Sequence, residues 1–173
     1  GADPGGVTPL MRAVRMNNVV DVRRLRGEPG GRAALEHDAD GLRPLHTAVK
    51  EEHGKNSVLV TQMLLRAGAD AMAETSEAQG VAQPLHLAAA AGFEQACFAL
   101  LDAKADVNAR QKDDQRPLHL AVARGHESVV EALLRVEGVD IEAAAAIKDR
   151  PVHKARARAK EPPPPARRAR PAS

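Results

Sequence analysis

The stretch that decides the fold is QRPLHLAVARGHESVVEALL, at residues 115–134. Pro117 fits the first turn of a helix, because the N–H that proline lacks has no intrahelical partner there. The apolar residues after it suit a short helix, and Gly125 supplies the left-handed backbone on which helices often end. Val129, Val130 and Leu133 then recur at helical spacing. The stretch therefore predicts two short helices joined by a tight turn.

The same pattern recurs in register along the whole chain. Five segments align on a proline, and the steps between the prolines are 35, 40, 33 and 34 residues. These segments are VTPLMRAV (7–14), LRPLHTAV (42–49), AQPLHLAA (82–89), QRPLHLAV (115–122) and DRPVHKAR (149–156). One such unit cannot bury its apolar face alone, so the units are expected to stack into an array. Trp and Tyr are absent and there are two Phe, so small and aliphatic side chains must fill the core.

The period and the motif resemble those of the ankyrin repeat, which has about 33 residues and a T-P-L-H-x-A signature. The resemblance implies an all-α repeat solenoid of stacked helix–turn–helix units with projecting hairpin or finger loops. We expect an N-terminal lead at 1–6, the array at 7–160 and a basic Pro/Arg-rich tail at 161–173. The units are placed at about 7–37, 38–73, 74–110, 111–144 and 145–160, and the last of them is truncated.

The 40-residue step indicates two insertions. Unit two gains about four residues near 52–57, between its helices, and the finger at 74–82 gains about three, relative to the ~33-residue period. Insertions in repeat arrays map to exposed loops and often to the binding face. The enlarged finger is therefore a candidate contact.

The position before the aligned proline departs from the signature. Only Thr8 keeps a hydroxyl that caps a helix, and Arg43, Gln83, Arg116 and Arg150 replace it elsewhere. We expect four helix caps to be lost. Two interpretations of the arginine row remain open: local ion pairs with the nearby Asp40, Asp114 and Asp149, or a ladder of guanidinium groups that grips carboxylates or phosphates.

The histidines and the cysteine favour structural roles. His46, His86, His119 and His153 share one repeat position, where the family resemblance implies a hydrogen bond that links neighbouring units. They are too far apart for a shared metal, and Cys97 aligns with a buried helix position, so we expect an inert thiol. No phosphate-binding loop or nucleophile motif is present. We therefore expect no enzyme activity, no cofactor, no metal and no small-molecule substrate.

The charge is uneven. Residues 154–173 carry seven Lys or Arg and one Glu, whereas the rest of the chain carries 18 Lys or Arg and 22 Asp or Glu. The tail could attach the array to nucleic acid or an anionic membrane, or it could be a solubilising end. No apolar run reaches the roughly 20 residues that a membrane helix needs. An intracellular location is expected, in cytoplasm or nucleus, or in an organelle if the missing initiator Met reflects processing.

The leading hypothesis is a protein–protein interaction scaffold or adaptor, and a specific version of it is an accessory subunit of a larger assembly. The resemblance implies that the finger tips and the concave face of the first helices bind the partner. The predicted contact residues also include basic residues of the arginine row and the tail, because of their charge. An ankyrin segment of a larger enzyme is a further alternative. The residues predicted to contact a partner are His37, Ala39, Asp40, Leu42, Arg43, Lys50, Glu51, Glu74, Glu77, Gln79, Ala90, Ala91, Arg110, Lys112, Asp113, Gln115, Arg116, Arg124, Arg150, Arg156, Arg158, Arg167, Arg168 and Arg170.

Overall fold

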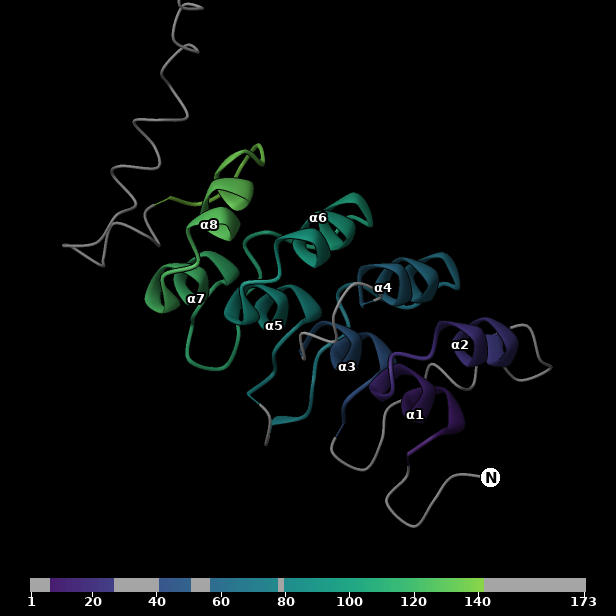
Figure 1. The fold of residues 1–173 in the computed structure, drawn as a ribbon. Helices are drawn as coiled ribbons and strands as arrows, with labels where there is room; N and C mark the ends of the chain where they lie inside the picture. The colour runs from purple at the N-terminus through teal and green to yellow at the C-terminus, as the bar shows by residue number, and fades with distance from the viewer. Residues whose placement is uncertain (1–6, 27–40, 51–56, 78–79, 142–173) are drawn as a thin grey trace, which may run out of the picture.

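Paired helices stack side by side in the computed structural model, which describes residues 7–26, 41–50, 57–77 and 80–141. Within these residues there are eight helices and no strand. The inner layer consists of α1 (Pro9–Arg15), α3 (Pro44–Lys50), α5 (Pro84–Ala91) and α7 (Pro117–Arg124). The outer layer consists of α2 (Val19–Arg26), α4 (Ser57–Arg66), α6 (Glu94–Asp102) and α8 (Glu127–Leu134). Figure 1 shows the two layers and the loops that project beyond the inner one. The predicted all-α solenoid is confirmed.

Each inner helix begins at its aligned proline. Thr8 caps α1, since its Oγ1 accepts a hydrogen bond from the N–H of Met11 at 3.2 Å. A guanidinium has no acceptor, so Arg116 cannot cap α7 in this way. A different hydrogen bond forms at the start of α7, where the N–H of Arg116 donates to Nδ1 of His119 at 3.0 Å. The expected loss of the side-chain caps is therefore partly offset by the histidine of the motif.

The same histidines also reach the next finger. His46 and His86 are fully buried. Nε2 of His46 lies 2.8 Å from the carbonyl oxygen of Ala73, and Nε2 of His86 lies 3.0 Å from that of Ala109. Their Nδ1 atoms accept from the N–H groups of Arg43 and Gln83. Burial lowers the pKa of His86, and its neutral ring donates through Nε2. The Nε2 bonds to Ala73 and Ala109 close units two and three, and Nε2 of His86 also lies 3.2 Å from the carbonyl oxygen of Gln115 in unit four, so the expected link to a neighbouring unit is confirmed for His86.

The separation of these partners locates one of the predicted insertions. His46 and Ala73 are 27 positions apart, whereas His86 and Ala109 are 23 apart. The hydrogen bond is nevertheless the same in both units. The four extra residues of unit two are therefore accommodated between the two ends of the unit, as the sequence predicted.

Two glycines end inner helices in the left-handed conformation. Gly92 and Gly125 both have φ +75°. A Cβ on Gly92 would lie 2.5 Å from Nδ1 of His126 in the next unit. Nε2 of His126 in turn lies 3.0 Å from the carbonyl oxygen of Ala90. The missing side chain of Gly92 is thus what lets His126 dock on the end of α5.

Aliphatic side chains fill the core between the layers. The inner helices contribute Leu10, Leu45, Leu85 and Leu118, each at most 2% exposed. Alanines pack beside them with no exposed surface, which allows close approach of the helices. Cys97 is buried in α6, and desolvation raises the pKa of its thiol to about 12. The expected burial of the thiol is confirmed, and its inertness stays a prediction.

Candidate functional site

The exposed surface of the inner helices is cationic. The sequences of α1, α3, α5 and α7 contain no Asp or Glu, whereas they contain Arg12, Arg15, Lys50 and Arg124, all exposed. We call the exposed and half-buried residues of these four helices the inner-helix face. Lys50 and Arg124 are predicted contact residues, and the structure places both on this face.

The middle of the inner-helix face is small and apolar. Ala90 and Ala91 at the end of α5 are half-buried, and Ala123 of α7 is exposed. Leu87 and Leu120, at equivalent positions of the two helices, are half-buried beside them. A partner can therefore approach the backbone of α5 and α7 closely between the cationic groups.

Arg124 is held across the end of the neighbouring helix. Its Nη1 donates to the carbonyl oxygen of Ala90 at 3.3 Å, and this oxygen also lies 3.0 Å from Nε2 of His126. A cation at a helix C-terminus interacts favourably with the helix dipole. The guanidinium is thus positioned at the border of the apolar middle.

The fingers present exposed polar side chains on a connected backbone. Glu74 and Glu77 are exposed in the enlarged finger. The N–H of Lys112, in the next finger, donates to the carbonyl oxygen of Gly80 at 3.0 Å, so the two fingers are joined. The predicted finger residues that are exposed there are Arg110, Lys112, Asp113 and Gln115.

A second link joins the fingers of units three and four. Nδ2 of Asn108 donates to the carbonyl oxygen of Gly138 at 2.7 Å, and its Oδ1 accepts from the N–H of Asp140 at 2.8 Å. Met72 occupies the equivalent position one unit earlier and is 50% exposed. The side chain of Asn108 therefore makes a bond that Met72 cannot make.

Family comparison identifies the repeat. The family model for ankyrin repeats, in three copies, matches residues 54–145. This chain belongs to the ankyrin repeat family. A comparison with curated proteins finds no match. Ankyrin repeats are in general protein–protein interaction modules, and the family is typically non-catalytic. The described residues include the first ankyrin helix pair, α1 and α2, which precedes the matched region.

The predicted ion pairs of the arginine row in the ankyrin units need one correction. Arg116 pairs with Asp140 and not with Asp114, and its side chain is 12% exposed. Asp114 instead pairs with Arg110, whose Nη1 lies 2.6 Å from its Oδ1. The predicted local pair is wrong for Arg116, because the guanidinium reaches forward to the next finger. Arg43 is half-buried, and its Nε is buried without a hydrogen-bond partner among the described residues.

Leu42 also differs from its prediction. Its side chain is 9% exposed and lies in the core at the start of α3. Burial of this apolar side chain is favourable, although the residue belongs to a finger by alignment. We therefore omit it from the contact surface. The remaining predicted contacts lie outside the described residues, and they are His37, Ala39, Asp40, Glu51, Gln79, Arg150, Arg156, Arg158, Arg167, Arg168 and Arg170. The fifth ankyrin unit at 145–160 and the basic tail also lie there.

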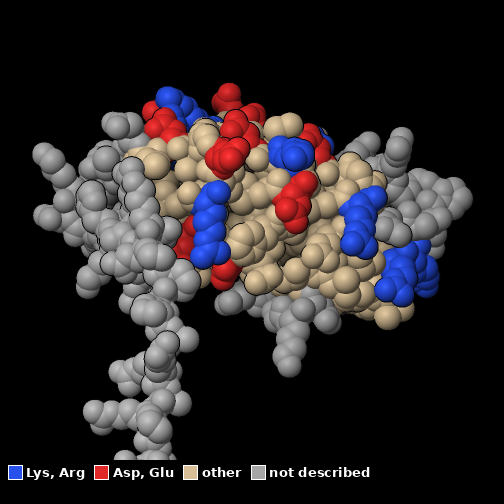
Figure 2. Space-filling model, turned by 90° about the horizontal axis from the view of Figure 1, so that it is seen from above, with Lys and Arg blue, Asp and Glu red and all other residues tan. Residues whose placement is uncertain are grey.

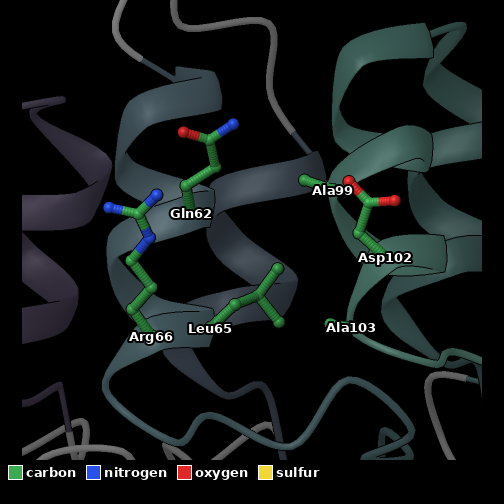
Figure 3. Close-up of a pocket in the computed structure, with 6 residues that line it drawn as sticks. All are labelled: Gln62, Leu65, Arg66, Ala99, Asp102 and Ala103. Atoms are coloured by element: carbon green, nitrogen blue, oxygen red, sulfur yellow. The ribbon is translucent and has the colours of Figure 1, made fainter.

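Sequence reasoning missed a hollow on the outer layer. A cavity of about 320 Å³ lies between α4 and α6 (Figure 3), and its lining residues are Gln62, Leu65, Arg66, Ala99, Asp102 and Ala103. The alignment of the ankyrin units contains one difference in side-chain size that indicates the hollow. Ala99 stands where unit two has Met63 when Leu64–Leu65 is aligned with Leu100–Leu101.

The outer layer also differs from the inner-helix face in charge. Figure 2 shows the side of the outer helices, where Lys and Arg lie among Asp and Glu. The basic residues of α2 are accompanied by Asp21, and Arg24 pairs with it at 3.8 Å. The charged residues of the inner-helix face are therefore all basic, whereas the outer layer carries both basic and acidic residues.

In residues 7–26, 41–50, 57–77 and 80–141 no group of three His, Cys, Asp or Glu side chains is arranged to hold a metal ion. None of the helices in the same residues has the length and apolar character needed to cross a membrane.

Proposed function

We propose that this ankyrin chain is a non-catalytic adaptor or an accessory subunit, which binds a protein partner through its fingers and its inner-helix face. The proposal rests on the hydrogen bonds that hold the backbone beneath the exposed side chains of the fingers and the inner helices. His46 and His86 tie the inner helices to the fingers, and Lys112 and Asn108 tie the fingers to one another. Such a surface loses little conformational freedom on binding, so more of the contact energy remains as affinity.

The composition limits the anchors that this surface can supply. Binding hot spots are enriched in Trp, Tyr and Arg, and this chain has neither Trp nor Tyr. Met16 and Met72 are 73% and 50% exposed, and flexible methionines adapt to different partners. Arginine and methionine are therefore the proposed anchors, and large aromatic anchors have to come from the partner.

A second candidate function rests on the charge of the tail. Seven Lys or Arg in residues 154–173 could bind nucleic acid or an anionic membrane. Binding of that kind weakens steeply with salt, because each neutralised phosphate releases counterions. The intracellular location remains a prediction.

Cross-linking mass spectrometry on protein isolated from its native source at moderate salt tests the proposal. We expect stoichiometric links from Lys50 and Lys112 to one protein. The absence of a protein partner, together with release of nucleic acid or lipid on raising the salt, would contradict the adaptor function and favour the tail. Lys154 and Lys160 report on the basic C-terminal residues 154–173 in the same experiment, because links confined to them would place the contact there and not on the fingers or the inner-helix face.

A further inference from the structure

The inner-helix face has a charge pattern that selects one kind of partner. Its cations occupy the two ends of the described array, with Arg12, Arg15 and Lys50 on α1 and α3, and Arg124 on α7. α5 carries no charged residue, and α1, α3 and α7 carry no acid within their described bounds, while Glu51 after α3 lies outside the described residues. A surface lined by one sign of charge attracts the opposite sign and rejects its own.

We propose that the inner-helix face binds an acidic protein segment whose middle is apolar. This inference rests on the proposed function, since it specifies the chemistry of the partner at the same surface. Carboxylates at one end of the segment lie over α1 and α3, and a carboxylate at the other end meets Arg124. Apolar side chains between them cover Ala90, Ala91 and Ala123.

The length of the segment follows from the spacing of the helices. Lys50 and Arg124 lie two units apart, and packed helices are about 8–10 Å apart, so the cationic groups are separated by about 20 Å. A helical segment spans this distance with about 13 residues, at 1.5 Å per residue. An extended segment spans it with about six residues. The acids of the partner are therefore separated by about 12 positions in a helix or about five in a strand.

The same pattern disfavours a nucleic acid at this face. A polynucleotide presents phosphates at regular short intervals, so it is best bound by cations spread along its path. Here the centre of the path is alanine and leucine. Single-stranded nucleic acid also gains affinity by stacking on aromatic side chains, and the four inner helices have none.

The test is a display selection of random peptides of about 15 residues, long enough to cover the face. The bait is the full chain, as wild type and as two charge-reversed variants. The inner variant carries Arg15→Glu and Lys50→Glu. The matched control carries Arg23→Glu and Arg66→Glu, which change the same units and the same net charge on the outer helices. Thermal melts of all three proteins ensure that folded chains are compared.

We expect the wild type and the control to enrich peptides with acidic ends and an apolar centre. A synthetic peptide of that composition should bind the inner variant at least about tenfold more weakly than the control, with the difference shrinking at high salt. Enriched peptides without net negative charge, or equal losses in both variants, would overturn the acidic preference and leave the protein-binding function standing. Failure to enrich any peptide on any bait counts against both. Binding of a fluorescent duplex DNA that is lost in the inner variant alone would also overturn the inference.

Discussion

Replacing Gly92 by Ala tests how one ankyrin unit is joined to the next. Two costs follow from the structure. The residue has φ +75°, a conformation that costs an L-residue about 1–2 kcal/mol. The new Cβ also lies 2.5 Å from Nδ1 of His126, so the ring must move and its bond to Ala90, worth about 1 kcal/mol, is lost. We expect the free energy of unfolding to fall by about 2–3 kcal/mol.

Gly125→Ala is the matched control. Gly125 has the same φ of +75°, but a Cβ there meets nothing within 4 Å in the part of the chain that the structure describes. This variant should lose only the backbone cost of about 1–2 kcal/mol. The difference between the two variants therefore isolates the contact between units.

Urea unfolding followed by far-ultraviolet circular dichroism measures these losses, because the chain has no Trp or Tyr to report by fluorescence. His126→Ala provides the internal check. In its background, Gly92→Ala should cost no more than Gly125→Ala, since the ring that the methyl group displaces is gone. Equal losses for the two glycine variants in the wild-type background would refute the reasoning.

Four further outcomes are expected. Lys104 has φ +67°, whereas Gly68 and Gly138 occupy its position in other units, so Lys104→Gly should raise the free energy of unfolding by about 0.5–1 kcal/mol in urea titrations. Met72→Asn should add the bonds that Asn108 makes one unit later and raise the melting temperature, with a gain of about 1 kcal/mol; an unchanged melting temperature would show that the geometry differs between these fingers. Because the pKa of His86 is lowered in the folded protein, the unfolded state binds more protons as pH falls below about 6.5; stability should therefore decrease from pH 7.5 to 5.5, and less so in His86→Gln. The thiol of Cys97, with its pKa raised to about 12, should react with an alkylating reagent only in denaturant, as mass spectrometry of the native protein can check.

Local rules predicted the helix pairs, and the resemblance to the ankyrin repeat predicted how they stack. Pro117 begins a helix and Gly125 ends one for reasons that involve their own backbone, so the sequence shows them directly. The role of His86 followed from the resemblance to the ankyrin repeat, which implies a linking hydrogen bond at this repeat position. Cys97 was placed in the core because it aligns with an apolar position of the second helix of the repeat, and the structure buries it.

The surface could be predicted less well. Arg116 has Asp114 near it in sequence, but its long side chain reaches Asp140 instead, and the path of the chain between units decides that choice. Leu42 belongs to a finger by alignment but is buried, because the position of the finger relative to α3 determines its exposure. The hollow between α4 and α6 depends on the fit of two helices, and one alanine in place of a methionine is a weak signal of it.

The histidine bonds have a consequence for changes in chain length. Both ends of unit two are fixed by the bond from His46 to Ala73, although this unit has four residues more than the unit closed by His86 and Ala109. Lengthening a loop between two fixed ends is inexpensive, since each doubling of the loop length costs only about 0.6 kcal/mol in closure entropy. The connection between α3 and α4 is thus a natural place to graft a recognition tag or a fluorophore-binding sequence. Because the bond from His46 to Ala73 fixes both ends of the unit, we expect an insertion there to leave the spacing of the fingers unchanged.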